Sequence, residues 1–137
     1  MASISSVSAP QAAPKRGSTR LTRSSKLFKA IIKAIQEKKG SRIVSLDLRK
    51  IPEASADFFI VCEASSSVQI KAIAENIEEI VKQNVDERPF KSEGYQSLKW
   101  VLIDYVNIVV HIMQPEARRF YQLEEMWHDA PSAEHEG

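Results

Sequence analysis

Apolar residues recur along the chain in two spacings, which predict seven elements in the order αββαββα. Helical spacing predicts one helix from about Ser25 to just before Gly40, a second after Ser67 that carries Ile70 to Val81, and a third from Pro115 that closes before Pro131. Alternating positions or short apolar runs predict strands at about 44–49, 57–64, 98–105 and 108–113. This order is typical of an α/β (α+β) domain.

The last two predicted strands are separated only by Val106 and Asn107, which indicates an antiparallel hairpin. Residues directly opposite each other in such a pair point to the same side of the sheet. One side should therefore be uniformly apolar: Val101, Ile103, Tyr105, Ile108, Val110 and Ile112. The other side mixes aromatic, acidic, imidazole and thioether groups: Trp100, Leu102, Asp104, Val109, His111 and Met113. The first side is the predicted core side, and the second is the candidate site.

Asp104 and His111 share the mixed side as diagonal neighbours, about 7–8 Å apart at the backbone. Catalysis would need a nucleophile, a metal or a second acid as well. The single thiol, Cys62, is predicted to be a core residue, and the sequence contains no glycine-rich phosphate loop, no H-E-x-x-H and no cysteine pair for zinc. The residues thus favour no catalytic site, no metal and no cofactor.

Two interpretations of the mixed side stay open. Aromatic residues and methionine among isolated charges are typical of a protein-binding surface, which is the favoured interpretation. Alternatively, the last helix covers this side and makes it ordinary core, with Asp104 and His111 paired to each other.

Charge divides the 137 residues unevenly. Residues 1–25 hold four of the 19 basic residues and none of the 18 acidic ones, so the remainder carries a net charge of −3. We expect residues 1–23 to be a disordered, basic, Ser/Ala-rich tail, with an organellar transit peptide as the alternative. We further expect one domain over 24–130 and a flexible C-terminal tail over 131–137. No apolar run approaches the roughly 20 residues that span a bilayer.

The chain contains W-V-L-x-D-Y, which begins at Trp100, followed by V-V-H and then by R-x-F-Y-x-L-E-x-x-W, which ends at Trp127. Through these motifs, which are its most specific match, the sequence resembles the ribosomal silencing factor family, also called RsfS or Iojap, from about Ser25 to Asp129. The hairpin turn departs from the family pattern. Family members usually have a small residue, often Gly, and then Asp where this chain has Val106 and Asn107.

The resemblance implies a mixed β-sheet flanked by helices, related to nucleotidyltransferases but without their activity. The chain indeed lacks the D-x-D carboxylate pair that two-metal transfer would need. The resemblance also implies a cytoplasmic bacterial factor, often a homodimer when free, that binds protein fourteen of the large ribosomal subunit. Binding there would block joining of the small subunit and repress translation under nutrient limitation. The competing classes are a nucleotidyltransferase-type enzyme and an RNA-binding module.

Carried over by position, the resemblance implies a contact set for the ribosomal protein: Trp100, Leu102, Asp104, His111, Met113, Tyr121 and Glu124. Within this set we expect Trp100 to be a desolvated anchor, Asp104 to face a basic group, and His111 to orient Asp104. The basic tail is a weaker candidate for contact with ribosomal RNA.

Overall fold

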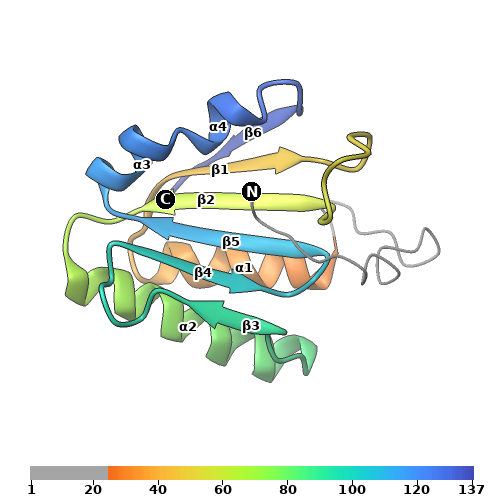
Figure 1. Cartoon of the computed structure of the whole chain (residues 1–137). Helices are drawn as coiled ribbons and strands as arrows, with labels where there is room; N and C mark the ends of the chain where they lie inside the picture. The colour runs from red at the N-terminus through yellow and green to blue at the C-terminus, as the bar shows by residue number, and fades with distance from the viewer. Residues whose placement is uncertain (1–24) are drawn as a thin grey trace.

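The computed structural model describes residues 25–137 and arranges them around one mixed sheet of six strands (Figure 1). Neighbouring strands follow the order β3-β4-β5-β2-β1-β6, in which β2 and β5 pair in parallel and the other pairs are antiparallel. The elements, in chain order, are α1 (Lys26–Glu37), β1 (Ser41–Asp47), β2 (Phe58–Glu63), α2 (Ser67–Val85), β3 (Lys91–Glu93), β4 (Trp100–Asp104), β5 (Ile108–Met113), α3 (Pro115–Tyr121), α4 (Leu123–Met126) and β6 (Ser132–His135). The predicted α+β class with a mixed sheet is confirmed.

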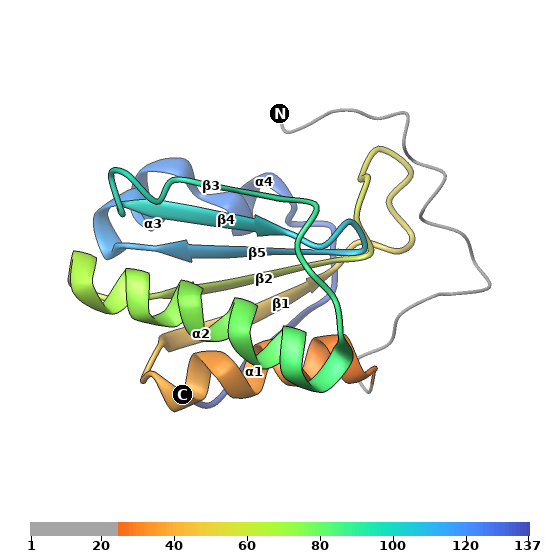
Figure 2. The same ribbon diagram turned by 90° about the horizontal axis from the view of Figure 1, so that it is seen from below.

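The long helices α1 and α2 lie side by side on one face of the sheet, and the short helices α3 and α4 lie on the other (Figure 2). Ser25 is the N-cap of α1, where its hydroxyl accepts a hydrogen bond from the Phe28 N–H, and Ser66 caps α2 in the same way through the Gln69 N–H. Each helix buries one apolar stripe against the sheet. None of the helices within residues 25–137 has the length and apolar character that crossing a bilayer requires.

The β4–β5 hairpin has the register that the sequence predicts. Trp100 is opposite Met113, Leu102 is opposite His111, and Asp104 is opposite Val109. The uniformly apolar side is core: the six predicted residues are all buried beneath α1 and α2. The mixed side therefore faces α3 and α4, on the opposite face of the sheet.

The turn of this hairpin is unusual. Val106 has φ +73°, and the Asn107 N–H donates to the carbonyl of Tyr105 at 2.9 Å. A β-branched residue rarely adopts this left-handed conformation, which glycine adopts readily. The departure from the family pattern at Val106 thus falls on the residue with the positive φ.

Two strands and one helix break differ from the prediction. The segment 131–137, expected as a flexible tail, contains β6, which pairs with the edge of β1. β3 pairs with β4 although its three residues are all exposed. The third predicted helix is split at Gln122, which has φ +49°. The expected domain limits remain predictions, and the tail 1–23 lies outside the described residues.

Candidate protein-binding surface

A groove of about 590 Å³ lies where the start of β4 meets α3. The rings of Trp100 and Tyr121 lie 4.6 Å apart along it, and Phe120 lies 4.9 Å from Tyr121. Phe120 is 79% exposed and Tyr121 is 48% exposed, so these rings have no complete cover in the described chain. Lys99 and Glu116 also line the groove and place one charge of each sign in it. We call Trp100, Phe120 and Tyr121 the aromatic surface.

Large exposed rings are scarce on a folded protein unless they serve an interaction. Here two exposed rings, Phe120 and Tyr121, are contiguous with the half-buried Trp100, and charged groups border them, which is typical of a protein-binding surface. The arrangement can bind an apolar or aromatic side chain of a partner.

His111 supports Trp100 and has no bond to Asp104. Its Nδ1 accepts a hydrogen bond of 3.1 Å from the indole Nε1 of Trp100, and its ring packs against Phe59 with centroids 4.6 Å apart. Burial without a compensating charge lowers the pKa of His111 to about 3, so the imidazole is neutral. The expectation that His111 orients Asp104 is therefore wrong. The hydrogen bond of His111 goes to the indole of Trp100 and orients that ring instead.

One carboxylate oxygen of Asp104 already has a hydrogen-bond partner in the turn that follows β4. Its Oδ1 accepts a 2.7 Å hydrogen bond from the Val106 N–H, the arrangement in which an aspartate stabilises a tight turn. Burial raises the pKa of Asp104, while the Val106 N–H and the charge of Lys91 act in the opposite direction. The side chain is half-buried and can still meet a basic group from outside.

The mixed side of the hairpin is half-buried along β4 and at Val109, and it is fully covered at the other two mixed-side positions of β5. Trp100, Leu102 and Asp104 are half-buried, whereas His111 is buried and Met113 is 0% exposed. Met113 packs with Val61 and Leu123 under α3 and α4. Each of the two interpretations therefore holds for one strand. The β4 residues keep accessible surface that a partner could contact, whereas α3 and α4 cover His111 and Met113 of β5.

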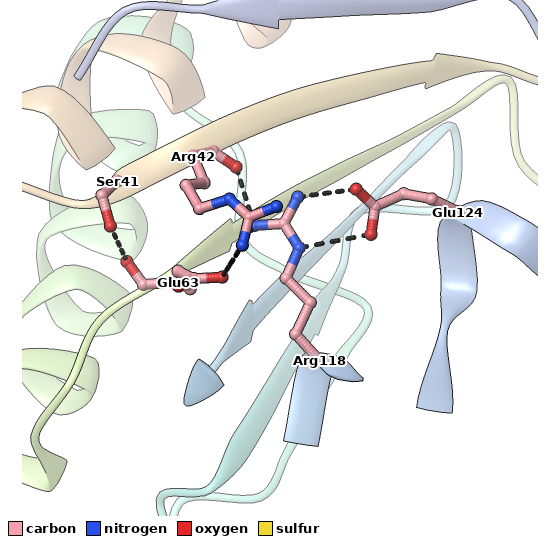
Figure 3. Close-up of polar contacts among 5 residues, drawn as sticks. All are labelled: Ser41, Arg42, Glu63, Arg118 and Glu124. Atoms are coloured by element: carbon pink, nitrogen blue, oxygen red, sulfur yellow. Dashed lines mark hydrogen bonds and ion pairs between the residues drawn. The ribbon is translucent and has the colours of Figure 1, made fainter. Parts of the chain in front are cut away.

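Glu124 is held by a buried arginine, as Figure 3 shows. Its two carboxylate oxygens accept hydrogen bonds from Nε and Nη2 of Arg118 at 3.2 and 2.8 Å. Nη1 of Arg118 donates to the Arg42 carbonyl at 2.8 Å and lies 3.4 Å from Oε1 of Glu63. Arg118 is only 6% exposed and holds the pKa of Glu124 below its usual range. Glu124 thus connects α4 to α3. Because both of its carboxylate oxygens already accept hydrogen bonds from Arg118, it has little capacity left to bind a partner.

Nothing in this region has the arrangement of a catalytic centre. Cys62 is 0% exposed, and burial raises the pKa of its thiol to about 12, so the predicted core role is confirmed. Among residues 25–137, no three His, Cys, Asp or Glu side chains are grouped so that they could hold a metal ion.

Sequence reasoning missed two residues of this region. Phe120 falls within the helix that the sequence predicts from Pro115, and the family resemblance gives it no contact role, yet it is the most exposed ring of the aromatic surface. Arg118 carried no signal of burial, because an arginine on an amphipathic helix normally lies in water. Its spacing of six residues to Glu124 crosses the break at Gln122, so helical periodicity could not pair them.

Comparison with known proteins gives a consistent result. The family model described as "Ribosomal silencing factor during starvation" matches residues 21–137. The ribosomal silencing factor RsfS of Halalkalibacterium halodurans is 36% identical over 111 residues, which cover 81% of this chain and 93% of that relative. The chloroplastic protein Iojap of Zea mays is 32% identical over 77% of this chain and 45% of that relative.

A solved structure gives the same answer for the fold. A crystal structure of a protein from Chromobacterium violaceum superimposes with a TM-score of 0.70 at 33% identity, covering 74% of this chain and 83% of that one.

The fold and the aromatic surface define an α+β domain with an aromatic groove that the described residues leave uncovered. The chain belongs to the family of ribosomal silencing factors, RsfS, as its match to the family model and its identity to the curated relatives show. The description of this family names the ribosome.

Proposed function

We propose that this protein binds protein fourteen of the large ribosomal subunit through the aromatic surface together with Leu102 and Asp104. Bound there, it occupies the place where the small subunit docks, prevents the two subunits from joining, and lowers translation when nutrients are scarce. The observation that carries the proposal is the contact of Trp100 with Tyr121, 4.6 Å between ring centroids, on a groove that no described segment covers.

The seven residues implied by the family resemblance take different roles in this proposal. Trp100, Tyr121, Leu102 and Asp104 make contacts, since they retain exposed surface. The other three residues make no contact with the partner and support the contact residues: His111, Met113 and Glu124. His111 fixes the Trp100 indole, Met113 packs beneath the groove, and Glu124 holds the two short helices together through Arg118. Phe120 joins the contact residues because of its exposure.

The mixture of rings and charges indicates what the partner should offer. An apolar side chain would fill the groove between Trp100 and Tyr121, and a basic group would lie near Asp104. Fully desolvated aromatic residues at the centre of an interface are those whose truncation typically costs about 2 kcal/mol or more.

Co-sedimentation with purified large and small subunits tests the proposal. Wild-type protein should sediment with large subunits only, and Trp100→Ala should bind at least about 30-fold more weakly, as a loss of about 2 kcal/mol implies. Phe90→Ala is the matched control, because Phe90 is an aromatic residue, 71% exposed, outside the contact set. It should bind like wild type.

Two further measurements complete the test. Thermal melting of Trp100→Ala must show a folded protein, since this change also leaves Nδ1 of His111 without its donor. A subunit-joining assay should show fewer joined ribosomes with wild-type protein and no decrease with the variant. Equal binding by Trp100→Ala and wild type would refute the proposed surface.

The proposal also covers the oligomeric state of the free protein and its location in the cell. We propose that the free protein forms a homodimer, which sedimentation at increasing concentration tests. We also propose a bacterial cytoplasmic location. The alternative is an organelle, since one relative is the chloroplastic protein Iojap of Zea mays; fusion of residues 1–23 to a reporter distinguishes the two.

A further inference from the structure

Helix α1 presents a row of lysines to the outside. Lys26, Lys29 and Lys33 are separated by three and four residues, so they lie along one side of the helix, and all three are exposed. At 1.5 Å per residue the row extends for about 10 Å. Within residues 25–137, none of the three forms an ion pair.

Five of the 15 lysine and arginine side chains of residues 25–137 form ion pairs, and the row belongs to the ten that do not. Several other cations have carboxylate partners: Arg42, Arg49, Lys82, Lys91 and Arg118. The single acidic residue of α1, Glu37, lies at the end of the helix, where its carboxylate accepts a hydrogen bond from the Asn76 amide. The positive charge on the exposed side of α1 is therefore uncompensated over its first two turns.

The sequence before the helix has the same sign. Residues 1–25 contain four basic residues and no acidic residue, and Arg23 precedes the N-cap Ser25 by two positions. The lysine row and the preceding segment thus form one continuous basic stretch of sequence, from Lys15 to Lys33.

The row faces away from the aromatic surface. α1 lies on one face of the sheet, and α3, which carries Phe120 and Tyr121, lies on the opposite face (Figure 2). A partner seated on the aromatic surface would leave the α1 lysines free for a second ligand.

We propose that Lys26, Lys29 and Lys33 form a second contact surface, which binds the phosphate backbone of ribosomal RNA while the protein is on the large subunit. This inference rests on the proposed function, which brings the protein to a particle that contains RNA. The role of the row is to add salt-sensitive affinity without reading sequence, since contacts to phosphate carry no base information.

The composition of the row favours RNA over other anionic partners. Protein interfaces are depleted in lysine and depend on apolar or aromatic anchors, and α1 exposes none. Amphipathic helices that bind membranes need large apolar groups beside the basic ones, and these are missing from the exposed side as well. Lysines without an apolar anchor are sufficient for phosphate contacts.

The test compares two triple variants with the same loss of charge. Lys26→Gln, Lys29→Gln and Lys33→Gln remove the row. The control combines Lys50→Gln, Lys71→Gln and Lys82→Gln, three exposed lysines outside α1 and outside the contact set. Affinity is measured for purified large subunits and, separately, for protein-free ribosomal RNA, between 50 and 200 mM salt.

If each lysine neutralises one phosphate, the row variant loses about 2.1 to 2.7 from the slope of log affinity against log salt. Raising the salt from 50 to 200 mM lowers the affinity of both proteins for large subunits. The fold-decrease for wild type should be about 20 to 40 times the fold-decrease for the row variant. Its binding to free RNA should decrease in the same way, and the control triple should retain the wild-type slope in both assays.

Three outcomes would overturn the inference. They are a wild-type slope for the row variant on large subunits, a control triple that loses as much slope as the row variant, and binding to anionic phospholipid vesicles with none to RNA. Failure of the proposed function is recognised separately, because it appears as no binding to large subunits or as normal binding by Trp100→Ala. In that case the free-RNA measurement alone decides whether the α1 row binds phosphate.

Discussion

The indole of Trp100 and the imidazole of His111 are joined by a hydrogen bond of 3.1 Å from Nε1 to Nδ1. The bond extends diagonally across the β4–β5 strand pair, between the residues opposite Met113 and Leu102. It fixes the tautomer of His111, because an Nδ1 that accepts a hydrogen bond must leave the ring proton on Nε2. Nε2 has no partner among the described residues. A half-exposed tryptophan is thus oriented by a buried, neutral histidine.

Stability should consequently decrease in mild acid. The pKa of His111 is about 3 in the folded protein and close to its ordinary value of 6.5 in the unfolded chain. As the pH falls below 6.5 the unfolded chain takes up the proton first, so the contribution of His111 is complete above pH 6.5 and is lost progressively towards pH 3. The loss is about 1.4 kcal/mol per pH unit, or about 2 kcal/mol between pH 6.5 and pH 5. Urea unfolding at both pH values measures it.

The control for this prediction is His111→Asn, whose side-chain oxygen can accept from the Trp100 indole but cannot be protonated in this range. The variant should be less stable at pH 7, and its stability should change much less between pH 6.5 and pH 5. The same pH dependence in His111→Asn and wild type would mean that another group is responsible.

Arg118 should be the most important charged residue for stability. Among the described residues, Arg118→Met leaves the buried carboxylate of Glu63 with the exposed Arg42 at 3.5 Å as its one cationic partner, and it releases Glu124. Removing one partner of a buried ion pair typically costs about 3–5 kcal/mol. Arg119→Met is the matched control on the same helix, since Arg119 is exposed, and it should change stability by less than about 0.5 kcal/mol. Similar melting temperatures for the two variants would contradict the structural role of Arg118.

The sequence predicted the hairpin well and its surroundings less well, for physical reasons. In β4 and β5 the alternation of side chains fixes both register and faces, because a shift by one residue would move every apolar group to the wrong side. β6, with the sequence Ser-Ala-Glu-His, pairs through its backbone, and its alternation of exposed and half-buried residues involves no large apolar side chain. His111 is opposite Leu102, so Trp100 and Asp104 are its two diagonal neighbours on β4. Which of them it contacts depends on side-chain rotamers, which the sequence pattern does not give. The burial of Arg118 depended on the break at Gln122, which no local pattern marks.

The hairpin turn should be improved by glycine. Val106 has φ +73°, a conformation that costs a non-glycine residue about 1–3 kcal/mol and that glycine adopts freely. Against this, glycine loses roughly 0.5–1 kcal/mol more conformational entropy on folding. Val106→Gly should therefore stabilise the protein by about 1 kcal/mol in urea unfolding. Val109→Gly, a change of the same residue types within β5, should destabilise it. A destabilised Val106→Gly would mean that the valine side chain contributes more packing than its turn costs.

The two ends of the chain should respond differently to truncation. Removing residues 131–137 deletes β6 and with it the backbone pairing to the edge of β1. It also removes the contact of 3.0 Å between His135 Nε2 and the hydroxyl of Ser45, which is 0% exposed, and the bond from the Asp47 N–H to the Pro131 carbonyl. A buried hydroxyl left without a partner and an uncovered strand edge should together cost about 2 kcal/mol or more. We expect the melting temperature to fall by roughly 5–10 °C.

Removal of residues 1–23 is the control at the other end, because that stretch has few large apolar side chains to bury and leaves the N-cap Ser25 in place. Its melting temperature should equal that of the full chain. The point variant Ser45→Ala separates the two losses, since it removes the hydroxyl and leaves β6 paired, and it should cost only part of the effect of the truncation. If the truncation at 131 melts like the full chain, β6 contributes nothing to folding, and residues 131–137 behave as the flexible tail that the sequence predicts.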